Sequence, residues 1–145
     1  MSTTAARRPA APAKARFPRL DLEPAYTTPL GRAYQADALD VLRQLPSDSV
    51  SLVVTSPPFA LIRQKAYGNV SHEAYIEWFW PFAEEIHRVL KPEGSFVLEI
   101  GGAWNSGSPT RSLYQYELVI RLCKMFHLAQ DFYWFNPSRL PTPAE

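Results

Sequence analysis

The strongest constraint on the fold is a short apolar run that two prolines interrupt. The residues from Val50 to Thr55 are β-branched or apolar apart from one serine, which is typical of a strand buried in a parallel sheet. Ser56-Pro57-Pro58-Phe59 follows at once, and consecutive prolines can continue neither a strand ladder nor a helix. We therefore predict a buried strand over 50–55 that ends at Ser56, with the prolyl carbonyls held rigidly outward.

The sequence around this run alternates between strand and helix patterns. Asp37 stands where an N-cap residue would begin a helix, and Pro81 is expected to kink a longer helix or to start a second one. Further strands are predicted at 31–35, 95–100 and 127–135, and helices at 38–45, 72–90 and 113–126. Such alternation is typical of βαβ units, so the predicted fold class is α/β, with a parallel sheet flanked by helices.

Three loops are expected to meet at one edge of this sheet. Ser56-Pro57-Pro58-Phe59, Gly101-Gly102 and Asn136-Pro137-Ser138 each follow a predicted strand. In open parallel sheets, ligands bind at the carboxyl ends of the strands. The sequence therefore predicts a site at this edge.

The segment from Ser56 to Phe59 suits chemistry on an aromatic amine. It contains a hydroxyl, fixed carbonyl acceptors and an aromatic face. An exocyclic amine is a poor nucleophile because its nitrogen lone pair is delocalised into the ring. Acceptors outside the ring plane would draw the two N–H bonds toward a tetrahedral arrangement, which frees the lone pair to attack a methyl sulfonium directly. Phe59 would stack on a base that has left the duplex.

Thr55-Ser56-Pro57-Pro58-Phe59 resembles the catalytic motif of the DNA amino-methyltransferases. The serine is typical of N4-cytosine enzymes, whereas Asp or Asn there is more typical of N6-adenine enzymes. Segments 36–42, 91–97 and 131–141 are similar to further elements of this family, so the resemblance covers about residues 26–145. Their order is that of the permuted class, in which the catalytic region comes first, as in type II restriction–modification systems.

The resemblance implies a site-specific methyltransferase with a Rossmann-like fold. It would transfer a methyl group from S-adenosylmethionine to the N4 amine of a flipped cytosine in double-stranded DNA. Ser56 and the carbonyl of Pro57 would hold the amine, and Phe59 would stack on the ring, with Pro58 completing the motif. The cofactor candidates are Asp37, with Tyr26, Thr27 and Thr28. The DNA-binding candidates are Arg63, Lys65, Tyr67, Ser138 and Arg139.

Two elements of the family pattern have no counterpart in the sequence. They are the Gly-rich F-x-G-x-G cofactor loop and the target-recognition segment expected after Pro143. We therefore expect a disordered Ala/Pro/Arg-rich tail over 1–20 and an incomplete catalytic part of a methyltransferase domain over 21–145. The chain would be a fragment, a truncated product or one half of a split enzyme that a second polypeptide completes. An N6-adenine enzyme and a non-catalytic, DNA-binding remnant remain as alternatives.

Charge and composition exclude several other classes of protein. Residues 1–20 hold five basic and no acidic residues, whereas residues 21–145 hold ten basic and fourteen acidic ones, unlike a polybasic nucleic-acid binder. The chain has a single cysteine, Cys123, so it cannot form an internal disulfide. Cys123 follows leucine rather than proline, which argues against cytosine-C5 chemistry. We expect its side chain to lie in the core. The three histidines lack metal-ligand spacing, so no metal is expected. No apolar run suits a membrane span or a secretory signal, and a cytoplasmic location is predicted.

Overall fold

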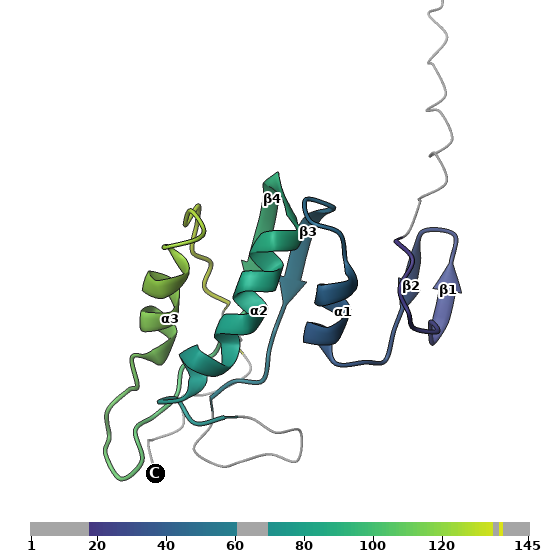
Figure 1. Cartoon of the computed structure of the whole chain (residues 1–145). Helices are drawn as coiled ribbons and strands as arrows, with labels where there is room; N and C mark the ends of the chain where they lie inside the picture. Colours follow the sequence, from purple (N-terminus) through teal and green to yellow (C-terminus); the bar gives the residue numbers. More distant parts are fainter. Residues whose placement is uncertain (1–17, 61–69, 135–136, 138–145) are drawn as a thin grey trace, which may run out of the picture. The chain divides into compact units, whose positions relative to one another are not determined.

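The computed structural model describes residues 18–60, 70–134 and 137. The chain forms two compact units, residues 1–45 and residues 46–145 (Figure 1). Most of the tail predicted over 1–20 falls outside the described residues.

The first unit contains a small antiparallel hairpin. Strand β1 (Tyr26–Thr28) pairs with β2 (Gly31–Ala33), with Tyr26 opposite Ala33. The Thr28 hydroxyl stabilises the turn, because it accepts a bond from the Leu30 amide and donates one to the Gly31 carbonyl. The strand predicted at 31–35 is therefore confirmed in shortened form, and its partner β1 was not expected.

A short helix, α1 (Ala38–Gln44), follows in the same unit. The carboxylate of Asp37 accepts hydrogen bonds from the amides of Leu39 at 2.9 Å and Asp40 at 3.3 Å. These two bonds satisfy amides that have no partner within the helix. The predicted helix and its N-cap are confirmed.

The second unit is built on two parallel strands, β3 (Val50–Thr55) and β4 (Leu90–Leu98). Strand β3 has the predicted bounds. Strand β4 begins earlier than predicted, because Leu90 pairs with Val50 before the register shifts and Ser95 pairs with Leu52. The intervening Lys-Pro-Glu-Gly segment forms the irregularity, which suits a proline that has no amide to donate. From Ser95 onward the pairing is regular to the ends of both strands.

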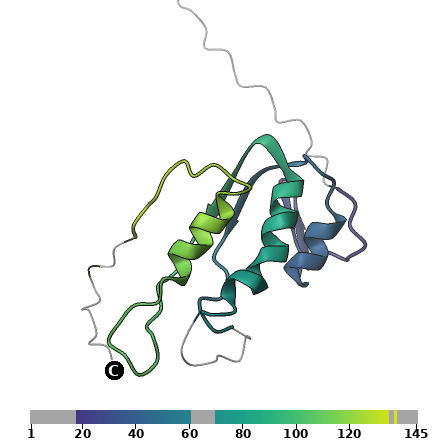
Figure 2. The ribbon, with the colours of Figure 1, turned by 60° about the vertical axis from the view of Figure 1, so that its left-hand side comes forward.

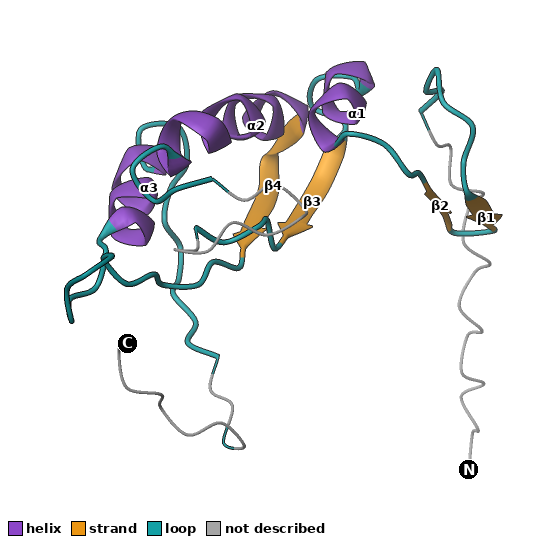
Figure 3. Ribbon diagram, turned by 90° about the horizontal axis from the view of Figure 1, so that it is seen from below, coloured by secondary structure: helices purple, strands orange, loops and turns teal. Residues whose placement is uncertain are grey.

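Two helices lie side by side against one face of these strands (Figures 2 and 3). They are α2 (Tyr75–Val89) and α3 (Tyr114–Leu122). Pro81 lies inside α2, which continues through it as one helix. Of the two alternatives expected for this proline, a second helix start is therefore wrong, and the kink stays a prediction. A proline removes one helical hydrogen bond, and here the buried residues before and after it still lie on a common face.

The core lies between the two helices and the inner face of the sheet. Phe96 and Leu98 of β4 pack against a buried cluster that the helices dominate, composed of Ala60, Tyr75, Phe79, Ala83, Ala103, Tyr114, Leu118 and Leu122. The outer face is open to solvent: Leu52 is 54% exposed, Val54 67% and Val97 48%. The prediction that the whole 50–55 strand is buried is therefore wrong for this face, since no described element covers it.

The third core strand predicted over 127–135 is also wrong. Residues 127–134 form no strand, and Phe132, Tyr133 and Trp134 are each at least 80% exposed. The alternating apolar pattern is suited to a strand, but a strand also needs a neighbour to complete its ladder. Within the described residues, β3 and β4 pair only with each other.

Cys123 lies on the surface rather than in the core. It is the C-cap residue of α3, one position beyond the buried Leu122. The helix ends before Cys123 can join the inward face, so the core prediction for this thiol is wrong.

Candidate active site

The segment after β3 leaves the sheet at its carboxyl end, as predicted. The last ladder contact is the hydrogen bond of 3.0 Å from the Glu99 amide to the Thr55 carbonyl. Beyond it Ser56 is exposed, the two prolines and Phe59 are half-buried, and Ala60 is buried. The motif thus begins at the surface and ends anchored in the core.

Two buried tyrosines hold the loops that follow the two strands. The hydroxyl of Tyr75, from α2, donates a hydrogen bond of 3.0 Å to the Pro58 carbonyl. The hydroxyl of Tyr114, from α3, donates to the carbonyl of Gly101, just beyond β4. The two rings meet edge to face with their centroids 4.9 Å apart. The pair therefore ties the end of β3 to the end of β4 through the core.

The burial of this pair also suppresses its ionisation. Burial raises the pKa of Tyr75 well above its usual value, and the neighbouring Tyr114 raises it further. Burial likewise raises the pKa of Tyr114, although a hydrogen bond with the backbone of Ala60 opposes the rise. Both phenols therefore stay protonated, as a donor to a carbonyl must be.

Phe59 is fixed by a close approach to Gly101. A Cβ atom added at Gly101 would lie 2.7 Å from Cδ2 and 2.9 Å from Cε2 of the Phe59 ring. No side chain fits in that space, so glycine is required for the ring to lie where it does. Two of the three loops predicted to meet at this edge do meet, through Phe59 and Gly101. The third, over 136–138, lies outside the described residues except for Pro137.

The two prolyl carbonyls of the motif differ in their availability. Pro58 has the Tyr75 hydroxyl as its donor. Among the described residues, no group donates a hydrogen bond to the Pro57 carbonyl. The geometry thus leaves Pro57 as the acceptor open to a ligand, beside the exposed Ser56 and the half-buried ring of Phe59.

Comparisons with known proteins agree with the motif. The family model described as "DNA methylase", which covers N6 and N4 methyltransferases, matches residues 50–145. The chain belongs to this family of DNA methylases.

Relatives of this methylase chain include type II methyltransferases. The chain is 51% identical over 125 residues to type II methyltransferase M.PvuII of Proteus hauseri, covering 85% of this chain and 37% of the relative. It is 32% identical over 89 residues to M.BamHI of Bacillus amyloliquefaciens, covering 59% and 21%. The resemblance seen in the sequence is confirmed.

A solved structure shares the fold of this methylase chain. The match, titled PvuII DNA methyltransferase (cytosine-N4-specific), has a TM-score of 0.75 at 50% identity and covers 86% of this chain and 45% of that one. The predicted class, part of a Rossmann-like methyltransferase fold with a parallel sheet flanked by helices, is confirmed. The methylase chain spans less than half the length of these two proteins.

The cofactor candidates of this methylase chain all lie in the first unit. Tyr26, Thr27 and Thr28 form the exposed strand β1, and the Thr28 hydroxyl is engaged in the hairpin turn. Asp37 caps α1 through one carboxylate oxygen, Oδ1. A carboxylate has further acceptor capacity at its second oxygen, so the cap and a ligand contact are compatible.

The DNA-binding candidates lie outside the described residues. These are Arg63, Lys65, Tyr67, Ser138 and Arg139. Their assignment stays a prediction from the sequence.

Three contacts at this edge were not predicted from the sequence: the hydrogen bonds of Tyr75 and Tyr114, and the close approach of Phe59 to Gly101. Tyr75 and Tyr114 each lie on the apolar face of a helix, where a tyrosine is expected to be an ordinary core residue. Gly101 was recognised as the end of a strand, and its contact with Phe59 was not. The only sequence signal for all three is that a buried tyrosine hydroxyl needs an acceptor, which the two strand-end loops supply.

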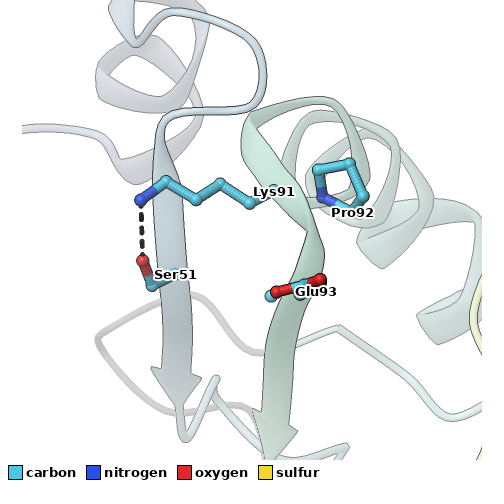
Figure 4. Close-up of a pocket in the computed structure, with 5 residues that line it drawn as sticks. Ser51, Lys91, Pro92 and Glu93 are labelled. Atoms are coloured by element: carbon cyan, nitrogen blue, oxygen red, sulfur yellow. Dashed lines mark hydrogen bonds between the residues drawn. The ribbon is translucent and has the colours of Figure 1, made fainter.

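A surface pocket of about 570 Å³ lies elsewhere, near the start of the two strands. Figure 4 shows Lys91 of β4 reaching to Ser51 of β3, with a hydrogen bond of 3.0 Å between Nζ and Oγ. The remaining lining residues come from the irregular start of β4. This hollow is at the opposite end of the strands from Ser56 and shares no residue with the motif.

The described residues contain neither a metal-ligand cluster nor a membrane-spanning helix. Among the described residues, no three His, Cys, Asp or Glu side chains gather as metal ligands. Within the same part of the chain, no helix has the length and apolar character that a membrane crossing requires.

Proposed function

We propose that this chain is the catalytic part of a site-specific DNA methyltransferase that modifies the N4 amine of cytosine in double-stranded DNA. The observation that carries the proposal is the arrangement of the Ser56–Phe59 segment at the carboxyl end of β3. The Pro58 carbonyl accepts a hydrogen bond from the Tyr75 hydroxyl, and the Pro57 carbonyl has no donor among the described residues. The cytosine-N4-specific title of the matched structure supports the choice of base.

The residues of the motif would activate the target amine without forming a covalent bond to it. The Pro57 carbonyl accepts one N–H of the amine and Ser56 accepts the other, both from outside the plane of the base. The lone pair of the nitrogen is then directed away from the ring, toward the methyl donor. Phe59, braced by Gly101, stacks on the flipped base and holds it in that orientation.

S-adenosylmethionine would supply the electrophilic methyl group. Asp37 suits this cofactor because a carboxylate can accept from an ammonium or a hydroxyl while its Oδ1 still caps α1. The hydroxyls of Tyr26, Thr27 and Thr28 offer further polar contacts from β1. The sequence holds no F-x-G-x-G loop, so we propose that these residues hold only part of the cofactor.

The DNA would be held by residues that follow the motif in the sequence. We assign this role to Arg63, Lys65 and Tyr67, with Ser138 and Arg139 near the end of the chain. A second polypeptide, or a further segment, would supply the target reader and the rest of the cofactor site. The proposed setting is a cytoplasmic type II restriction–modification system, in line with the names of the relatives.

Two alternatives remain open and are separated by the same assay. The family model covers both N6 and N4 methyltransferases, so adenine N6 is the rival target. The second rival is a non-catalytic remnant that binds DNA without cofactor. Both alternatives predict that no N4-methylcytosine forms.

The first experiment is calorimetric titration of this chain with S-adenosylmethionine, alone and with a polypeptide that carries the Gly-rich segment. Methyl transfer to duplex DNA is then measured, and the modified base is identified by mass spectrometry. We expect N4-methylcytosine, with transfer abolished by Ser56→Ala or Pro57→Ala in a folded protein. The exposed thiol makes Cys123→Ser the matched control, and its turnover is expected to be normal. Absence of cofactor binding under both conditions would favour the remnant.

A further inference from the structure

A braced hairpin follows β4 at the edge that carries the Ser56–Phe59 segment. It spans residues 103–112, and Trp104 lies opposite Arg111 in an antiparallel bridge. The Ser112 amide donates to the Ala103 carbonyl at 2.9 Å, and side-chain bonds from Asn105 close the interior of the loop. The hairpin therefore presents its side chains from a fixed backbone.

The guanidinium of Arg111 is held on an aromatic face in this hairpin. Its Cζ atom lies 4.0 Å from the centroid of the Trp104 ring, which is a close cation–π contact. The stacking restricts the long side chain before any ligand arrives, which lowers the entropy lost on binding. The residue is nevertheless exposed, so its outward N–H groups face solvent.

Arg111 lies next to the motif. Its Nη1 atom is 3.4 Å from the point where a Cβ on Gly102 would stand. Gly102 directly follows Gly101, where an added Cβ would lie 2.7 Å from the ring of Phe59. The cation is thus separated from the proposed base-stacking ring by two glycines that carry no side chain.

The charge of Arg111 is not neutralised by its described surroundings. Two other arginines of the second unit, Arg88 and Arg121, form ion pairs with Glu85 and Glu77. No described carboxylate lies within 4.0 Å of the Arg111 guanidinium. Over residues 46–145 the acidic residues outnumber the basic ones, so Arg111 supplies a positive charge with no described ion-pair partner in a unit of net negative charge.

The corner beside Arg111 has additional unused hydrogen-bonding capacity. The carboxamide of Gln115 reaches the same point above Gly102, with Oε1 at 3.1 Å and Nε2 at 3.3 Å. Its Oε1 is buried and has no partner among the described residues. That oxygen is an acceptor, so it calls for an N–H or O–H donor and is no partner for a phosphate; the cation of Arg111 alone suits an anion at this corner.

We propose that Arg111, held on Trp104, binds a phosphodiester of the DNA strand whose base enters the Ser56–Phe59 segment. This inference rests on the proposed function and adds a DNA contact to it. A flipped base brings its own backbone with it, so an anionic group must arrive near the motif. A planar guanidinium suits two phosphate oxygens at once, and such contacts fix the strand's position without reading its sequence.

The test compares Arg111→Gln with a matched variant, Arg121→Gln. Arg121 also lies over an indole, 4.7 Å from the Trp80 centroid, but it is ion-paired with Glu77. Binding of the full chain to a short duplex with one unpaired cytosine is followed by fluorescence anisotropy over a series of salt concentrations. The logarithm of the binding constant falls linearly with the logarithm of the salt concentration, and loss of one phosphate contact should make this slope less steep by about 0.9. We expect that change for Arg111→Gln alone.

Two further measurements keep the outcomes distinct. Equal thermal midpoints for both variants would show that the fold is intact, and Arg111→Lys should retain most of the salt slope because it keeps the charge. An unchanged slope for Arg111→Gln would overturn the inference while leaving the proposed function standing. A weaker affinity for S-adenosylmethionine with an unchanged slope would also overturn it, since the guanidinium would then serve the cofactor's carboxylate. A wild-type chain that binds no DNA, either alone or with the polypeptide that carries the Gly-rich segment, would refute the proposed function itself.

Discussion

The hydroxyl of Tyr75 donates a 3.0 Å hydrogen bond to the carbonyl of Pro58, which joins the first turn of α2 to the segment after β3. Tyr75 is fully buried, so water does not compete for this bond. The bond engages one of two adjacent prolyl carbonyls, and the other, that of Pro57, has no donor among the described residues. In the proposed function, a core side chain thereby leaves Pro57 as the acceptor for the target amine.

Tyr75→Phe should slow methyl transfer more than it weakens the fold. The ring still fills the core, and loss of one hydrogen bond costs about 1 kcal/mol of unfolding free energy. The Pro58 carbonyl loses its donor, so the segment becomes free to rotate away from the base. We expect kcat to fall about tenfold, equivalent to about 1.4 kcal/mol of barrier, with little change in KM for DNA. Steady-state methylation kinetics measure both constants.

The control for this substitution is Tyr116→Phe. Tyr116 lies on the exposed side of α3 and loses the same oxygen without contacting the motif. Its kinetics should match those of the wild type. A kcat for Tyr75→Phe equal to that of Tyr116→Phe would show that the Pro58 bond does not position the motif.

Gly101→Ala should displace the Phe59 ring. The new methyl group would stand 2.7 Å from Cδ2 of that ring, and either the ring or the backbone must move. Such overpacking costs about 1–3 kcal/mol of unfolding free energy. The rate of methyl transfer is expected to fall by at least as much as the lost stability alone would predict, because the base loses its stacking surface. Chemical denaturation and a transfer assay on the same sample measure the two effects.

A second glycine and a double substitution make this test specific. At Gly31 an added Cβ would meet only the Thr28 hydroxyl at 3.7 Å, an ordinary contact, so Gly31→Ala should be nearly neutral. Combining Gly101→Ala with Phe59→Ala should cost less stability than the sum of the two single changes, because the clash is gone. Strict additivity would contradict the proposed contact.

Local sequence patterns predicted the elements of this fold well where a single segment carries the signal. Strand β3 has the predicted bounds because a β-branched run and two prolines mark both its extent and its end. Helix α1 begins as predicted because Asp37 can cap only the residues that follow it. The position of the motif at the carboxyl end of β3 follows from the same local signals.

The errors concern features that depend on distant segments. An apolar run such as Leu52 to Val54 cannot show whether other elements pack against both faces of the sheet. Here the outer face is exposed to solvent. The pattern at 127–134 likewise required a neighbouring strand, which no described element supplies. The bonds of Tyr75 and Tyr114 link residues far apart in the sequence, and no periodicity marks them.

The contrast between the two faces of the sheet predicts a contrast in stability. Leu118 of α3 is fully buried in the core, so Leu118→Ala removes packed methyl groups and leaves a cavity. The expected loss is about 2–5 kcal/mol of unfolding free energy. Val54→Ala on the outer face leaves no cavity, since that side chain is 67% exposed, and should cost less than about 1 kcal/mol. Urea denaturation of both variants decides the matter, and equal losses would mean that the outer face is covered in solution.

The buried tyrosine pair predicts a loss of stability at alkaline pH. An unfolded tyrosine ionises near pH 10, whereas burial raises the pKa of Tyr75 in the folded protein above its usual value of 10.0, and Tyr114 adds to the rise. Above pH 10 the unfolded state therefore holds fewer protons than the folded state. Stability is fully present below that pH and falls as pH increases toward the folded pKa. Each such phenol contributes a decline of about 1.4 kcal/mol per pH unit.

Tyr75→Phe removes one of these ionisable groups and should flatten the alkaline decline. The unfolding free energy is measured by urea denaturation at several values between about pH 8 and about pH 11. At neutral pH the unfolding free energy of the variant should be lower than that of the wild type, because the hydrogen bond to Pro58 is lost. Above about pH 10 it should decline less steeply than that of the wild type, by about 1.4 kcal/mol per pH unit. Tyr116→Phe, which removes an exposed phenol, should keep the wild-type slope. Parallel curves for the wild type and Tyr75→Phe would mean that the phenol of Tyr75 ionises equally in both states, and that the core around it is open to water.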